Sequence, residues 1–106
     1  MPPSLADPAV LIDDELQERA TVVEVRAPDA PAVLYRVTRA LGGLGLDIRT
    51  AKVTTLGHEV VDAFSVFRIG PDGERRKVGE LGAAIREAIL AELSAPISGP
   101  TAAVAP

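Results

Sequence analysis

Residues 51–66, AKVTTLGHEVVDAFSV, decide the fold, because they read as two strands joined by a tight turn. Gly57-His58 supplies the turn, since glycine accepts the backbone angles that a short hairpin loop requires. The second strand runs from Glu59 to Ile69. Its apolar residues fall on both faces: Val60, Phe64 and Val66 on one, and Val61, Ala63, Phe67 and Ile69 on the other. We therefore expect both faces of this strand to be at least partly covered.

The first strand of the hairpin, residues 46–56, changes phase partway along. Its apolar residues stand first at even and then at odd positions: Leu46 and Ile48, then Ala51 and Val53. A β-bulge near Arg49-Thr50 would reconcile the two halves, and bulges often re-aim side chains beside binding sites. Ile48, Arg49 and Thr50 are therefore candidate site residues. The alternative is that the strand has been assigned the wrong phase.

A helix is predicted ahead of this strand, with Pro31 in its first turn and Asp29 as a capping acid. Its apolar stripe is Leu34, Val37, Leu41 and Leu44, with Arg36 and Arg39 pointing away from it. Glycines at 42, 43 and 45 are expected to stop the helix by adopting left-handed backbone angles. The N-terminus of this helix offers unpaired N–H groups and a positive dipole, which suit a carboxylate.

Three further segments complete the pattern. Residues 21–26 alternate as a strand, residues 10–12 form a short apolar run, and residues 78–93 carry a second helical stripe. That stripe is Val78, Leu81, Ile85, Ile89 and Leu93. The order is β-α-β-β-α, an α+β ferredoxin-like arrangement with two helices on one face of an antiparallel sheet. The usual last strand is missing, and residues 10–12 are expected to double back into its place.

The two ends of the chain differ from the middle. Residues 1–8 contain three prolines, and residues 94–106 are Ser, Ala, Gly, Pro and other uncharged residues. Such segments bury too little apolar surface to offset the conformational entropy of ordering them. We expect flexible segments at 1–8 and 94–106 and one folded domain at 9–93.

Composition excludes several classes of function. The chain has 106 residues, a net charge of −4 and no cysteine. The absence of cysteine excludes disulfides and thiol nucleophiles and is typical of the cytoplasm, while the negative charge disfavours nucleic-acid binding. No apolar run approaches the length of a membrane span. The acidic run at 13–15 lacks metal-loop spacing and is interpreted as a solvated connector. The mixed charges at 74–77 indicate a solvated turn, and His58 is interpreted as a solvated turn residue. We therefore expect no catalytic constellation, metal or cofactor.

Three stretches resemble the ACT domain family. Residues 26–35, RAPDAPAVLY, are similar to its Asp-x-Pro-Gly-Leu-Leu opening, and residues 44–48, LGLDI, to its helix exit. The hairpin at 51–66 is more selective and looks like the C-terminal ACT domains of the bacterial PII uridylyltransferase/uridylyl-removing enzyme family. The resemblance covers residues 10–93.

The resemblance implies a function and a site. ACT domains pair edge to edge and bind amino acids at the loop between the first strand and the first helix. In the uridylyltransferases they resemble glutamine sensors that report to nucleotidyltransferase and hydrolase domains, which this chain lacks. The implied ligand-binding residues are Asp29, Ala30, Pro31, Ala32, Val33 and Leu34. Asp29 would meet an α-ammonium group, and Ala32 stands where the family usually has glycine, so its methyl group would crowd the pocket or restrict the loop.

Two other classes of function remain open. The chain could be a pure interaction module that forms a homodimer, pairs with a second ACT domain of the same chain, or docks on its parent enzyme. The apolar faces of residues 59–69 and the alanine at 32 favour that reading. A small enzyme of the acylphosphatase type ranks last, because residues 29–32 place an acid where a phosphate would bind.

Overall fold

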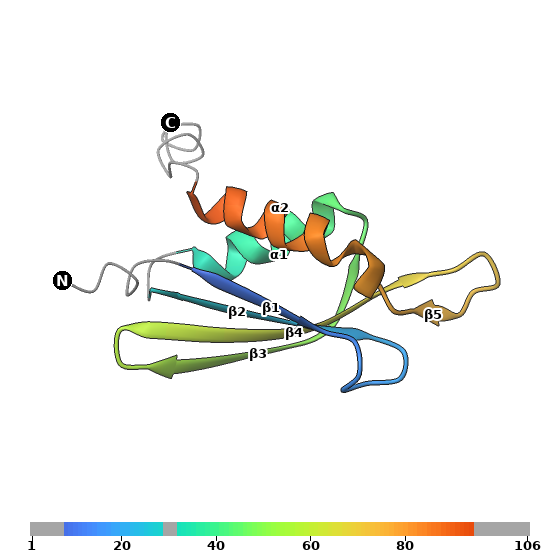
Figure 1. The fold of residues 1–106 in the computed structure, drawn as a ribbon, viewed down its shortest axis with the longest axis horizontal. Coiled ribbons are helices and arrows are strands. Elements are labelled where there is room, and N and C mark those ends of the chain that lie inside the picture. Colours follow the sequence, from blue (N-terminus) through green and yellow to red (C-terminus); the bar gives the residue numbers. More distant parts are fainter. Residues whose placement is uncertain (1–7, 29–31, 95–106) are drawn as a thin grey trace, which may run out of the picture.

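Four strands form an antiparallel sheet in the order β1-β2-β4-β3, and a short fifth strand pairs with the end of β4 (Figure 1). The strands are β1 (Ala9–Asp13), β2 (Thr21–Pro28), β3 (Asp47–Leu56), β4 (Glu59–Ile69) and β5 (Arg75–Arg76). The computed structural model describes residues 8–28 and 32–94. Of the predicted flexible ends, 1–8 and 94–106, all but residues 8 and 94 lie outside these ranges, as do the predicted site residues 29–31.

The N-terminal strand occupies the predicted edge position. β1 runs antiparallel to β2, with Val10 opposite Val25 and Ile12 opposite Val23. The apolar run at 10–12 therefore doubles back beside β2, as expected. β2 itself continues two residues beyond the predicted Arg26, because Ala27 is buried opposite Val60 of β4.

Both helices, α1 (Val33–Gly43) and α2 (Gly82–Ser94), lie on the same side of the sheet (Figure 1). The sheet face beneath them carries alternate residues of β2 and β4, among them Val23, Val25 and Phe64, all fully buried. Leu41 of α1 and Ile85 of α2 close this core from above. The ferredoxin-like α+β arrangement is confirmed.

The buried stripe of α1 differs from the predicted one. The residues that face the core are Val33, Val37, Ala40 and Leu41. Leu34 and Leu44 are instead 44% and 36% exposed, because the helix is rotated so that Val33 and Ala40 turn inward. Of the predicted glycine stops, Gly42 and Gly43 continue the helix, and only Gly45 has a left-handed backbone, with φ at 77°.

The second helix is shorter than predicted. A 3-10 turn, η2 (Gly79–Leu81), precedes α2, and Val78 is buried before it. The Val78 N–H donates to Thr21 Oγ1 at 2.8 Å, and that hydroxyl donates to Asp14 Oδ1 at 2.5 Å. Asp14, predicted as part of a solvated connector, therefore anchors the start of β2. This relay fixes where the chain turns from the sheet into η2.

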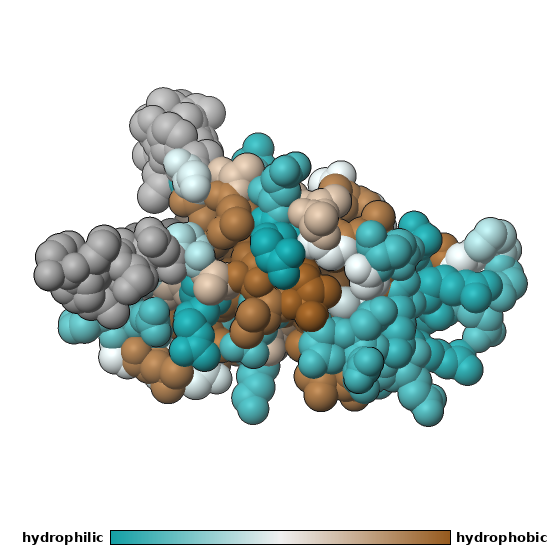
Figure 2. Space-filling model, viewed as in Figure 1, coloured by the Kyte–Doolittle hydropathy of each residue, from teal (hydrophilic) through white to brown (hydrophobic). Residues whose placement is uncertain are grey.

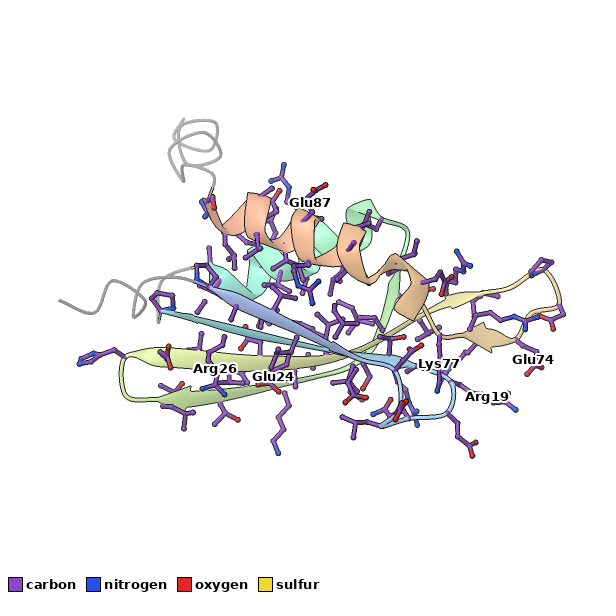
Figure 3. All side chains as sticks on the ribbon, viewed as in Figure 1. Arg19, Glu24, Arg26, Glu74, Lys77 and Glu87 are labelled. Carbon is purple, nitrogen blue, oxygen red and sulfur yellow. The ribbon has the colours of Figure 1, made fainter. Side chains whose placement is uncertain are left out.

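The segment predicted as a solvated turn at 74–77 contains β5. Arg75 and Arg76 pair with Ile69 and Arg68 of β4, although both arginines stay exposed. Arg19 reaches across to Glu74 at 2.7 Å from the β1–β2 connector (Figure 3). This end of the molecule is the hydrophilic region at the right of Figure 2.

The hairpin has the predicted turn and bulge. Gly57 adopts a φ of 64°, His58 is exposed, and the register of β3 against β4 shifts between Ile48 and Thr50. β4 has buried side chains on both faces, Phe64 on one and Phe67 on the other. Every residue of β3 is exposed, so the helices leave the outer strand of the sheet uncovered.

Candidate functional site

A groove of about 240 Å³ lies between the start of α1 and the hairpin. Its lining residues are Ala32, Val33 and Leu34 from the start of α1, Val53 and Thr55 from β3, and Val60 and Asp62 from β4. The volume is below the range of about 300–1,000 Å³ of pockets that hold drug-sized ligands. The groove therefore suits a small molecule. It exists because the helices cover β1, β2 and β4 but leave β3 open.

The helix end of the groove is formed by an unusual residue. Ala32, which precedes α1, has a φ of 68°, and it is the only residue other than glycine with positive φ among those the structure describes. Its carbonyl accepts the Arg36 N–H at 2.8 Å. The N–H groups of Val33 and Leu34 belong to the first turn, where an α-helix supplies no partner. These donors and the helix dipole favour a negatively charged group at this end.

The sheet side of the groove holds a buried carboxylate. Asp62 lies on the core-facing side of β4 between Val25 of β2 and Val53 of β3, and only 1% of it is exposed. Its Oδ1 atom has no hydrogen-bond partner among the described residues. Burial raises the pKa of the Asp62 carboxyl, because a low-dielectric surrounding disfavours the charged form. Such a group destabilises the fold unless something else binds it.

No titratable neighbour of Asp62 lines the groove among the described residues. On β2 and β3 its cross-strand partners are both valines. The charged residues Glu24 and Arg26 of β2 point to the opposite side of the sheet, away from the helices, where they approach each other at 3.6 Å (Figure 3). Arg36 of α1 donates instead to the carbonyl oxygens of Glu92 and Leu93 in α2. The carboxylate thus has no compensating cation in the described part of the chain.

The predicted site residues separate into three groups. Ala32, Val33 and Leu34 line the groove, so the structure brings them together with the hairpin. The bulge residues Ile48, Arg49 and Thr50 lie beside Ser65 and Val66 of β4, farther along the strand than the groove, and do not line it. Their role in binding stays a prediction. Residues 29–31 are outside the described part.

Sequence reasoning missed Asp62, Val53, Thr55 and Val60 as site residues. Asp62 carries a signal that could have found it, because it shares the parity of Val60 and Phe64 on an otherwise apolar strand face. An acid at a core-facing position is rarely buried without a partner. The exposure of Val53, 51%, has no comparable sequence signal, because it follows from where the helices sit.

Neither a metal-binding cluster nor a membrane-spanning helix occurs in residues 8–28 and 32–94. These ranges hold no group of three or more His, Asp or Glu residues placed to bind a metal ion. They also contain no helix with the length and apolarity to cross a membrane.

Comparison with known proteins identifies the family. The model of the family described as plant bHLH transcription factor, ACT-like domain, matches residues 14–90. No solved structure is significantly similar to the chain.

Curated relatives with significant similarity are bifunctional uridylyltransferase/uridylyl-removing enzymes. The enzyme from Streptomyces coelicolor is 49% identical over 61 residues, or 58% of this chain. Those from Azospirillum brasilense and Gluconobacter oxydans are each 39% identical, over 84% and 88% of this chain. The chain spans only 7% to 10% of the lengths of these three relatives. The antiparallel sheet beneath two helices, the match to the family model and these similarities together show that the chain belongs to the ACT-like domain family.

Proposed function

We propose that this chain is the amino-acid-sensing regulatory domain of a cytoplasmic uridylyltransferase/uridylyl-removing enzyme, with glutamine as the first ligand to test. The observation that carries the proposal is the groove between α1 and the hairpin, with helix N–H groups on one side and a buried carboxylate on the other. A free amino acid carries both charges that this pair of groups would bind. The similarity to uridylyltransferases supports the choice of parent enzyme and of nitrogen signalling.

The position of the groove suggests how binding would be transmitted. A ligand held there contacts α1 and β3, two elements that come together only through this groove and the sheet. Bridging them fixes the exposed outer strand against the first helix. Because ligand binding stabilises the state that it binds, the arrangement of β3 that a parent enzyme meets would then depend on ligand concentration.

Thermal unfolding with each of the twenty amino acids tests the proposal. A ligand at a hundredfold excess over its Kd should stabilise the chain by about 2.7 kcal/mol. We expect saturable stabilisation by glutamine and little by most others. If none of the twenty shifts the melting temperature at millimolar concentration, the sensing function is refuted.

A docking function is the second candidate, and the exposure of β3 favours it. This strand is the edge of the sheet, all of its residues are exposed, and Val53 and Leu56 are each about half exposed. An open edge of this length readily pairs with another strand. The chain would then form a homodimer, or pair with another ACT domain, without a ligand. Sedimentation at increasing concentration distinguishes the two: docking alone predicts a ligand-independent dimer, whereas a monomer throughout argues against it.

A further inference from the structure

The buried Asp62 carboxylate is unfavourable where it stands, because nothing in the described part of the chain compensates its Oδ1 atom. It is 1% exposed, its cross-strand neighbours are Val25 and Val53, and Oδ1 meets no donor among the described residues. Buried carboxylates are normally paired or hydrogen-bonded, because water otherwise solvates them far better than protein does. An uncompensated group of this kind marks a place where a partner from outside completes the structure.

The groove determines what that partner can be. Apart from Asp62, the described side chains that line it are aliphatic, with the single hydroxyl of Thr55. One carboxylate and one hydroxyl do not make a metal site, and the described residues hold no cluster of metal ligands. A group with several N–H donors and one positive charge fits best, because each carboxylate oxygen accepts more than one hydrogen bond.

The opposite end of the groove sets the orientation. The N–H groups of the first turn of α1, for which an α-helix supplies no acceptor, favour an anion there, beside Ala32 and Leu34. A molecule that carries an ammonium and a carboxylate group on one carbon atom would therefore lie with its carboxylate toward α1 and its ammonium toward β4. Aliphatic Val53 and Leu34, both partly exposed, would contact the remainder of such a molecule.

We propose that Asp62 is the group that binds the α-ammonium of the amino acid in this groove, so that β4 and not the loop before α1 selects for the amine. This inference rests on the proposed sensing function and adds a residue and a ligand orientation to it. It replaces Asp29 as the expected partner of the ammonium.

The test combines a change in the ligand, which removes the ammonium group, with a change in the protein, which removes the carboxylate that would bind it. L-glutamine and its deaminated analogue 4-carbamoylbutanoate are titrated by calorimetry into the wild-type chain and into Asp62→Asn. We expect wild type to bind glutamine about tenfold to a hundredfold more tightly than the analogue, the effect of a charge-assisted hydrogen bond. In Asp62→Asn that preference should disappear, because the two changes are not additive when they act on one contact.

Asp47→Asn is the matched control, since Asp47 is an exposed acid at the start of β3 that does not line the groove. It makes the same change in net charge and should leave the preference for glutamine intact. Without ligand, Asp62→Asn should melt higher than wild type, because it removes an uncompensated buried charge. A lower melting temperature or failure to fold overturns the inference, since Asp62 would then be satisfied within the fold.

The outcomes separate this inference from the proposed function. If wild type binds none of the twenty amino acids, both fail. If wild type binds glutamine and Asp62→Asn keeps the full preference over the analogue, sensing stands and Asp62 is not the ammonium site. Loss of the preference in Asp62→Asn, with Asp47→Asn unchanged, supports the inference.

Discussion

Ala32→Gly should stabilise the chain, the reverse of what glycine does at most positions. Ala32 has a φ of 68°, a left-handed conformation that costs an L-residue about 1–2 kcal/mol and glycine almost nothing. Glycine in turn adds about 0.4–1 kcal/mol of unfolded-state entropy. The difference leaves a net gain of about 0.5–1 kcal/mol, or roughly 2–8 °C in melting temperature for a domain of this size. Urea unfolding followed by circular dichroism measures it.

Two further variants make the prediction specific. Ala84→Gly, at an exposed position in α2 with ordinary helical angles, should lose about 0.5–1 kcal/mol through the same substitution. Ala32→Val should lose more than 1 kcal/mol, roughly, because a β-branched residue tolerates positive φ poorly. If Ala32→Gly is as destabilising as Ala84→Gly, the left-handed turn before α1 is wrong, and with it the shape of the groove.

Three other changes have clear expected results. Thr21→Val removes the hydroxyl between the Val78 N–H and Asp14, so it should cost about 1–3 kcal/mol in urea unfolding, and a neutral result would mean that the relay does not exist. Leu41→Ala leaves a cavity at a fully buried position and should lower the free energy of unfolding by about 2–5 kcal/mol. A loss below roughly 1 kcal/mol would mean that the rotation of α1 described here is wrong. The raised pKa of Asp62 means that the folded chain holds this proton more tightly than the unfolded chain. Stability from this group is therefore greatest at acid pH and declines as pH rises through the raised pKa. The stability gained by Asp62→Asn should accordingly grow as pH rises above the ordinary carboxyl pKa, and a difference that does not change with pH would contradict the assignment.

Topology was the most predictable part of the fold. Period-two alternation and the Gly57-His58 turn locate the hairpin, and the parity change at Ile48 and Ala51 locates the bulge that the register confirms. These signals are local, because a strand and its turn are encoded within a few residues. The placement of the N-terminal strand followed from the need to cover an open edge.

The rotation of α1 was not predictable in the same way. Val33 and Leu34 are adjacent and equally apolar, and the residue that turns inward depends on the left-handed turn at Ala32 and on packing against α2. Arg36 and Arg39 illustrate the packing against α2, because both contact that helix. The sequence indicates only that they lie off the apolar stripe of α1. Tertiary contacts decide such choices between equivalent local patterns.

The sequence predicts only part of the candidate site. The start of α1 was found through its resemblance to a known opening, and Ala32 was noticed as a departure whose backbone angle now explains why glycine would fit. Asp62 does not follow from the apolar pattern of its strand, because Val60 and Phe64 at the same parity indicate only a buried face. β5 was missed because two arginines have no preference for strands, and their pairing depends on the turn after β4.

The central claim is that the groove between α1 and the hairpin binds a free amino acid. Amide NMR spectra of the chain, recorded during a titration with L-glutamine, test it residue by residue. The account predicts saturable shifts confined to the start of α1, the Val53–Thr55 region of β3 and the Val60–Asp62 region of β4, with the far end of β3 around Asp47 unaffected. Shifts that map elsewhere, or a spectrum that no amino acid changes, would contradict it.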